Sequence, residues 1–195
     1  MTGEVMFAAG PYRAFALDAG DVARLQHFYE ANPGYHHLVN GEPPGAGEAR
    51  KDLDDVPPPG WPYDKRWLLG IVDEGDAMVG VADVTSNLLA AGVWHVGLFM
   101  VASSLHGSGA AKAIYGGLEA WMRDGGARWL RLGVVEGNAR GMRFWERAGY
   151  LEVRSRHGVA MGRRTHTVRL MAKPLANGRL PEYLGMVPRD RPDAP

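Results

Sequence analysis

The spacing of apolar residues along the chain predicts an alternation of strands and helices. Apolar positions that alternate or fill a short run indicate strands, whereas apolar positions three and four residues apart indicate helices. The predicted strands are 12–17, 67–73, 78–85, 94–101, 129–135, 151–155 and 165–173. The predicted helices are 22–31, the short acidic stretch 48–55, 112–123 and 139–148, with Asp21 and Asn138 as the N-caps of the first and the last.

The order of these segments predicts the topology. A first strand and helix are followed by a long loop, three antiparallel strands, a helix, a strand, a helix and a final pair of strands. Strands 94–101 and 129–135 flank a helix, so they are expected to be parallel. We therefore predict an α/β (α+β) fold with a mixed, mostly antiparallel central sheet of about six to seven strands and helices on both faces. Residues 1–176 form a single domain, and the proline-rich, charged tail 177–195 is expected to be partly disordered.

Composition narrows the class of protein. The 195 residues include 22 basic and 22 acidic side chains. The chain therefore lacks the excess of basic residues that nucleic-acid-binding domains usually have. There is no cysteine, which excludes disulfides and thiolate chemistry. No apolar run approaches the roughly 18 residues that span a bilayer. The first ten residues lack a basic start before a long apolar stretch, so we expect a cytoplasmic protein without a membrane partner.

The junction after strand 94–101 has the form of an anion site. The chain passes through Gly107-Ser108-Gly109 directly into a helix. Unpaired N–H groups and the helix dipole favour a negative charge at such a helix start, and small residues let a phosphate approach. A dinucleotide fingerprint needs a third glycine and a P-loop needs Gly-Lys-Ser/Thr, and neither occurs here. A helix start that only needed small residues is the simpler alternative.

The residues around this junction resemble a known family. The six residues 106–111 resemble motif A of the GNAT (Gcn5-related) N-acetyltransferases, Arg/Gln-x-x-Gly-x-Gly/Ala, behind a strand that ends at 101–103. The segments 134–139 and 144–150 resemble the later asparagine and aromatic-pair motifs. The resemblance covers roughly residues 67 to 173, and the predicted strand order is also that of the family.

The resemblance implies an acyl-CoA acyltransferase fold with acetyl-CoA as co-substrate. In the family the strand and the helix that flank motif A splay apart, the pantetheine arm lies in the gap and pairs with the strand backbone, and the pyrophosphate sits on the N–H groups that follow. Carried over to this sequence, the cofactor-binding residues are Met100, Val101, His106, Gly107, Ser108, Gly109, Ala110, Ala111, Lys112 and Asn138. Asn138 has plain helix capping as its alternative role. His106 replaces the usual arginine or glutamine, so phosphate binding either depends on pH or gains little from this side chain.

The implied function is an N-acetyltransferase that moves an acetyl group from acetyl-CoA to a primary amine by direct attack. The amine belongs to a small molecule, a protein N-terminus or a lysine. A non-catalytic acyl-CoA-binding sensor is the alternative, and a phosphate-anchored nucleotide binder is a third. Many relatives dimerise through late strands, which leaves a homodimer open.

Three residues are alternative candidates for the general base, namely Asp83, His95 and Glu136. Asp83 is favoured because a carboxylate within an apolar strand is costly to bury without a reason. Trp145 stands where many members carry a tyrosine that protonates the leaving thiolate. An indole N–H is not a useful acid, so water must serve or the thiolate must leave unprotonated. Tyr150 is expected to pack instead.

Two irregular segments are expected to select the acceptor. The proline- and glycine-rich segment 35–62 is typical of a binding loop, with Tyr35 and Glu42 as candidate substrate contacts. Its acidic run would attract a cationic amine or simply form a solvated face. Residues 154–164 form a basic loop that either contacts cofactor phosphates or an acidic acceptor, or is mobile. His36-His37 is not accompanied by a convincing ligand set, so no metal is expected.

Overall fold

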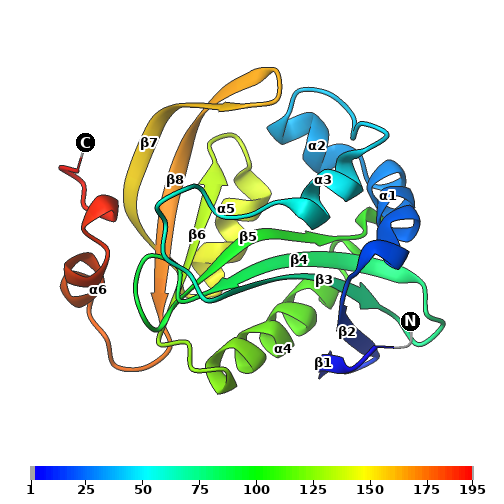
Figure 1. Ribbon diagram of the computed structural model, residues 1–195, viewed down its shortest axis with the longest axis horizontal. Helices are drawn as coiled ribbons and strands as arrows, with labels where there is room; N and C mark the ends of the chain where they lie inside the picture. The colour runs from blue at the N-terminus through cyan, green and yellow to red at the C-terminus, as the bar shows by residue number, and fades with distance from the viewer. Residues whose placement is uncertain (1–2, 195) are drawn as a thin grey trace.

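The computed structural model describes residues 3–194, whose strands form one mixed sheet (Figure 1). The strands are β1 (Val5–Ala9), β2 (Tyr12–Ala16), β3 (Lys65–Val72), β4 (Met78–Ser86), β5 (Val93–Val101), β6 (Trp129–Val135), β7 (Leu151–Met161) and β8 (Arg164–Pro174). They lie in the order β1-β2-β3-β4-β5-β6-β8-β7, and all neighbours are antiparallel except β5 and β6. This confirms the predicted fold, with eight strands in the described chain instead of six to seven.

Helices cover both faces of the sheet, as predicted. They are α1 (Val22–Ala31), α2 (Gly34–Val39), α3 (Glu48–Asp54), α4 (Ala110–Asp124), α5 (Ala139–Arg147) and α6 (Leu180–Met186). One face packs against α4 and α5, and the opposite face carries α1, α2, α3 and α6 (Figure 1). No helix within residues 3–194 has the length and hydropathy to cross a membrane.

The first strand, β1, was not predicted. It is an edge strand that pairs with β2 through an irregular register, and Phe7 is its only buried residue. Its sequence, Val-Met-Phe-Ala-Ala, has no alternation of apolar and polar residues. An edge strand with one buried side chain leaves too weak a pattern to recognise.

The parallel pair of strands at the centre of the sheet separates halfway along its length. β5 pairs with β6 only from Val93 to Val96 on the β5 side, although both strands continue beyond this point. On its other edge β5 shifts register against β4, because Asp83 pairs with Leu98 whereas Val84 pairs with Val96. Gly97 is the extra residue in this bulge, and bulges bend the strand that carries them. The result is a wedge between β5 and β6 that opens at Gly97.

The basic segment 154–164 is not a loop, which corrects the prediction. β7 continues to Met161 and β8 begins at Arg164, so the two strands form a long hairpin with a tight turn at Gly162-Arg163. The prediction failed because bulges interrupt the pairing of β7 with β8, which removes the regular alternation of a strand. The turn docks on the end of α2, where Asn40 O accepts a hydrogen bond from Arg163 N at 2.8 Å.

The C-terminal segment contains two short helical elements. Leu180–Met186 forms α6 and Pro188–Asp190 forms a short 3-10 helix, η3. Tyr183 and Asp190 have no exposed surface. The sequence hid this packing because the partner of Asp190 is Arg131 on β6, 59 residues earlier in the chain. A proline-rich and charged composition therefore does not exclude docking through a few long-range contacts.

Helix capping was predicted correctly at one of two positions. The side chain of Asn138 accepts a hydrogen bond from Gly141 N at 2.9 Å and caps α5. Asp21 makes no such bond to α1, because its carboxylate turns back to accept from Asp18 N in a short helix that precedes α1. Asp18 caps this short preceding helix, because its carboxylate accepts a hydrogen bond from Gly20 N.

Candidate functional site

A groove of about 1030 Å³ follows the wedge between β5 and β6. Its walls include Phe99, Met100 and Val101 from β5 and Gly133 from β6. Gly133 has no side chain to fill the space and is exposed within an otherwise buried strand. The β5 edge in this stretch has no strand partner on the β6 side, so its backbone groups can bind an extended ligand.

A loop with two left-handed glycines lies at the far end of β5. Gly107 has φ 83° and Gly109 has φ 89°, and a Cβ added to either would meet nothing within 4 Å. Glycine adopts this backbone without strain and leaves the space above the loop open. Ser108 Oγ donates to Leu105 O at 2.7 Å and accepts from Ala110 N at 3.2 Å, which fixes the start of α4. The loop therefore presents the N-terminus of a 15-residue helix to the groove.

Some of the predicted cofactor-binding residues line the groove, and the others lie beside it or below it. The groove is lined by Met100, Val101, His106, Ala111 and Asn138. The side chain of Ala110 is buried in the core below α4, so only its backbone is available. Gly107, Ser108, Gly109 and Lys112 are exposed beside the groove without lining it.

His106 is fully engaged by neighbouring groups. Its Nε2 lies 3.2 Å from Val101 O and therefore donates, so Nδ1 is left to accept from Arg140 Nη1. Arg140 was missed by the sequence reasoning, although it stands two residues after Asn138 and lines the same groove. The permanent positive charge at this end of the groove therefore belongs to Arg140, and His106 positions it.

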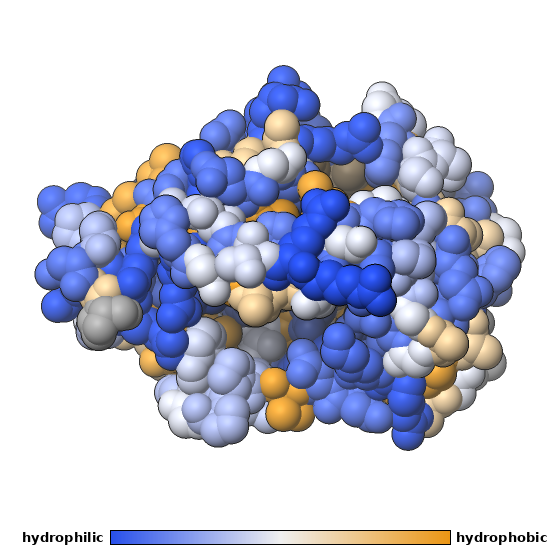
Figure 2. All heavy atoms as spheres, turned by 90° about the horizontal axis from the view of Figure 1, so that it is seen from above, coloured by the Kyte–Doolittle hydropathy of each residue, from blue (hydrophilic) through white to orange (hydrophobic). Residues whose placement is uncertain are grey.

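A second cavity of about 520 Å³ lies on the face that carries α2 and α3. Residues common to its wall and to the groove wall include Tyr35, Trp61, His95, Gly97 and Leu98. The two spaces thus meet at the bulge where β5 and β6 separate. Viewed from the side of α2 and the β7–β8 hairpin, the surface is mostly hydrophilic, with hydrophobic side chains showing between the hydrophilic ones (Figure 2). We call this second space the acceptor cavity.

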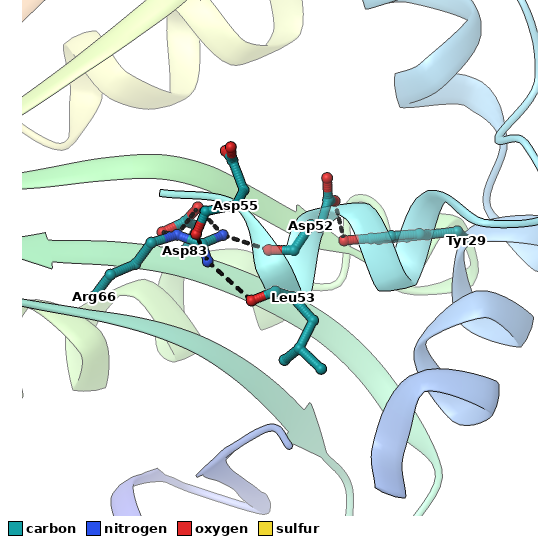
Figure 3. A network of polar contacts seen from close by, with 6 residues as sticks. All are labelled: Tyr29, Asp52, Leu53, Asp55, Arg66 and Asp83. Atoms are coloured by element: carbon teal, nitrogen blue, oxygen red, sulfur yellow. Dashed lines mark hydrogen bonds and ion pairs between the residues drawn. The ribbon is translucent and has the colours of Figure 1, made fainter. Parts of the chain in front are cut away.

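Asp83 lies at the meeting point of the two spaces. A Cβ added to Gly97 would be 3.4 Å from the Asp83 carboxyl carbon. Arg66 donates from Nη2 to Asp83 Oδ2 at 2.8 Å and also donates to the carbonyl oxygens of Asp52 and Asp55 (Figure 3). Burial raises the pKa of Asp83, and the hydrogen bond from Arg66 opposes this rise. Arg66 therefore orients the carboxylate and ties it to the end of α3.

His95 lines both spaces but is held as a neutral ring. Its Nδ1 lies 3.1 Å from Arg131 O and 3.3 Å from Arg131 Nη1, so an acceptor and a donor of the same arginine both contact this ring nitrogen. Burial, together with the adjacent Arg131 charge, lowers the pKa of His95 to about 3. A base works best when its pKa lies near the working pH. His95 is therefore better suited to accept a hydrogen bond than to remove a proton at neutral pH.

Two other predicted residues lie elsewhere. Glu136 is exposed and forms an ion pair with Arg169 at 3.0 Å. Glu42 forms an ion pair with Arg163 at 2.8 Å at the tip of the hairpin. Neither lines the groove or the acceptor cavity. Tyr35, by contrast, lines both, and burial raises its pKa to about 12, so its hydroxyl keeps its proton at neutral pH.

The comparisons with known proteins agree with this geometry. A sequence model described as the acetyltransferase (GNAT) family matches residues 33–150, which is more than half of the chain. The chain belongs to the GNAT family of acetyltransferases. No functionally curated protein matches it.

Solved GNAT structures share the fold at low sequence identity. An acetyltransferase from Thermus thermophilus is 20% identical, with a TM-score of 0.63 over 84% of this chain and 97% of that one. The Salmonella typhimurium acetyl transferase that modifies the N-terminal serine of L7/L12 is 15% identical, with a TM-score of 0.71 over 89% and 100%. Vibrio cholerae spermidine N-acetyltransferase, in complex with CoA and spermine, is 14% identical, with a TM-score of 0.62 over 85% and 96%.

An aromatic cluster forms the inner wall of the groove in this GNAT chain. Trp145 lines the groove beside Phe144 and is only 8% exposed. Behind it, the hydroxyls of Tyr115 and Tyr150 are hydrogen bonded at 3.0 Å, and burial raises the pKa of both. Tyr150 is buried and lines neither space, so it packs against its neighbours rather than facing the groove.

Proposed function

We propose that this GNAT chain transfers an acetyl group from acetyl-CoA to a primary amine. The observation that carries the proposal is the junction at Gly97, where an open strand edge, the half-buried carboxylate of Asp83 and a second cavity meet. Acetyl-CoA would enter along the groove, with its pyrophosphate at residues 107–112 and Arg140 close by. The amine would enter from the acceptor cavity and meet the thioester beside Asp83.

Asp83 is the general base of the proposed reaction. Its carboxylate takes the proton of the attacking amine, directly or through one water molecule. The nitrogen then forms a bond to the thioester carbon, the oxyanion is held by a β5 backbone N–H next to Gly97, and the carbon–sulfur bond breaks. The pKa of Asp83, raised by burial, makes it a stronger base than an exposed aspartate.

The leaving thiolate needs a proton, and Trp145 cannot supply it. Tyr35 is the tyrosine of the described chain that lines both the groove and the acceptor cavity. Since its pKa is raised to about 12, it is protonated over the whole neutral range. We propose that the Tyr35 hydroxyl takes the place of the tyrosine that Trp145 replaces.

The test of this function is Asp83→Asn with a panel of amines and acetyl-CoA. We expect kcat to fall by roughly 100-fold to 10,000-fold, because that is what a positioned base contributes. In the parent protein, activity should fall as pH drops through the raised pKa of Asp83, above the ordinary 3.8, because the protonated acid cannot accept a proton. The variant should lack this acid limb.

Asp54→Asn is the matched control, because Asp54 pairs with Arg50 on the surface of the same short helix that Arg66 anchors. It should keep the parent rate and pH profile. An unchanged pH profile in Asp83→Asn would remove Asp83 as the base.

A non-catalytic sensor of acyl-CoA is the second candidate, favoured by Trp145. The sensor would bind CoA without releasing thiol for any amine in the panel. Thiol release by the parent protein with any amine excludes it.

A further inference from the structure

Three arginines lie close together beside Trp61 on the acceptor side of the sheet. Arg131 comes from β6, Arg156 comes from β7, and Arg189 comes from η3. The guanidinium carbon of Arg189 lies 3.8 Å from the centre of the Trp61 ring, and that of Arg131 lies 5.7 Å from it. The residues converge from three elements that are far apart in sequence.

The carboxylate next to this cluster, Asp190, is already hydrogen bonded to other groups. Asp190 accepts from Arg131 at 2.7 and 3.0 Å and from Tyr183 at 2.5 Å. Arg156 and Arg189 have no ion pair within residues 3–194. Nε of Arg189 is buried and lacks a hydrogen-bond partner in the same part of the chain.

Like charges held together at a partly buried place are unfavourable unless an anion joins them. The positive charge of Arg189 is disfavoured in this way, because burial and the nearby charges of Arg156 and Arg131 all lower the pKa of Arg189. A guanidinium group presents a planar fork of donors that matches a carboxylate or phosphate. The cluster therefore has the chemistry of an oxyanion site.

The position of the cluster separates it from the phosphate end of the groove. Arg131 pairs with His95 across the β5–β6 ladder, whereas His106 and Arg140 lie beyond Val101. Six residues of β5 separate His95 from Val101, or about 20 Å at 3.3 Å per residue. Arg131, Arg156 and Trp61 line the groove at its inner end, and Trp61 also lines the acceptor cavity.

We infer that the acceptor is an amine that carries a carboxylate or similar oxyanion, which Arg156 binds together with Arg131 and Arg189 beside Trp61. This rests on the proposed function and narrows its substrate to an amino-acid-like class. The acceptor cavity, which shares Trp61 with the groove, is lined by Asp52, Asp55 and Asp83. A zwitterion would place its ammonium toward this acidic wall and Asp83, and its oxyanion toward the arginines.

The experiment compares common L-amino acids with their carboxamides, which have nearly the same shape without the negative charge. Thiol release from acetyl-CoA gives KM and kcat, and thermal denaturation gives binding without turnover. We expect acids to be used and to stabilise the protein more than the matching amides. The amine of an amide loses its proton more easily, so this preference would not reflect amine reactivity.

Arg156→Gln tests the site itself, because no described contact of Arg156 holds the fold together. The KM for the acid should rise about tenfold or more, the typical effect of losing a charged hydrogen bond. The KM for the amide and for acetyl-CoA should stay unchanged. Arg179→Gln, which removes an equal charge from an exposed surface pair, should behave as the parent protein does.

Each failure has its own signature. Equal use and equal binding of acids and amides overturn the inference but leave acetyl transfer intact. A higher KM for acetyl-CoA in Arg156→Gln overturns it by assigning the arginines to a cofactor phosphate. If no amine leads to thiol release, the proposed acetyl transfer is wrong, and the oxyanion site is then tested only by the thermal shifts. If no acid shifts the melting temperature, the inferred oxyanion site is wrong as well.

Discussion

The cofactor groove and the acceptor cavity meet at Gly97 but are built in different ways. The expected phosphate end of the groove is built mainly from one continuous stretch, 106–112, which acts through backbone conformation and small residues, and Arg140 is added from α5. The acceptor cavity is assembled from α2, α3, the 55–62 segment, β4 and the tip of the β7–β8 hairpin, and acts through side chains. A site made of adjacent backbone can be recognised in sequence, whereas a site made of distant side chains needs the fold.

The two regions also differ in charge. Arg140 gives the groove a cation where phosphates are expected. The acceptor cavity has an acidic wall around Asp83, and the groove faces it across Trp61 with the basic side chains of Arg131 and Arg156. The end of the groove at Arg140 is suited to an anion. The place where the groove and the acceptor cavity share Trp61 is suited to a molecule that carries both charges. Variants on either side can test whether the two regions act separately.

On the groove side, the largest effect on acetyl-CoA binding is expected from Gly109→Glu. Gly109 has φ 89° in open space, so the new side chain strains the backbone and places a negative charge where the pyrophosphate is expected. Acetyl-CoA affinity should fall by roughly 100-fold or more, measured by calorimetry. Gly10→Glu is the matched control, since Gly10 has φ 60° in open space at the turn between β1 and β2. Unchanged affinity in Gly109→Glu would place the cofactor elsewhere.

The next effect concerns the support of the acceptor side by the C-terminal segment. Asp190→Ala leaves the guanidinium of Arg131, 3% exposed, without its partner. Breaking a buried pair in this way costs about 3–5 kcal/mol, so the free energy of unfolding should fall by that amount in urea titrations. Asp193→Ala, an exposed change in the same segment, is the control. If Asp190→Ala has no effect, the C-terminal segment does not dock as described.

Sequence reasoning succeeded where the physics is local. The small residues before α4, the start of that helix and the cap at Asn138 depend on residues within a few positions of one another. It also predicted the parallel crossover, because a strand–helix–strand order leaves little choice of topology. These features carry the predicted phosphate end of the site.

The features that the sequence did not predict depend on residues far apart in the chain. Nothing near Asp83 predicts that Arg66 will hold it, and nothing near Arg131 predicts Asp190. Asp83 lies within β4 and Glu136 directly follows β6, yet Glu136 is exposed and Asp83 is half-buried at the bulge. The bulge at Gly97, which makes this difference useful, comes from the register of two strands and has no sequence pattern of its own.

The smallest effect is expected from Tyr35→Phe, which removes one hydroxyl where the two regions meet. If this hydroxyl protonates the thiolate, kcat should fall about tenfold while acetyl-CoA affinity stays the same, the lower end of what one hydrogen bond to a developing charge contributes. Tyr63→Phe is the control, because Tyr63 is exposed outside both spaces. An unchanged kcat would mean that the thiolate leaves unprotonated or takes its proton from water, and Trp145 would then mark a site that works without a tyrosine acid.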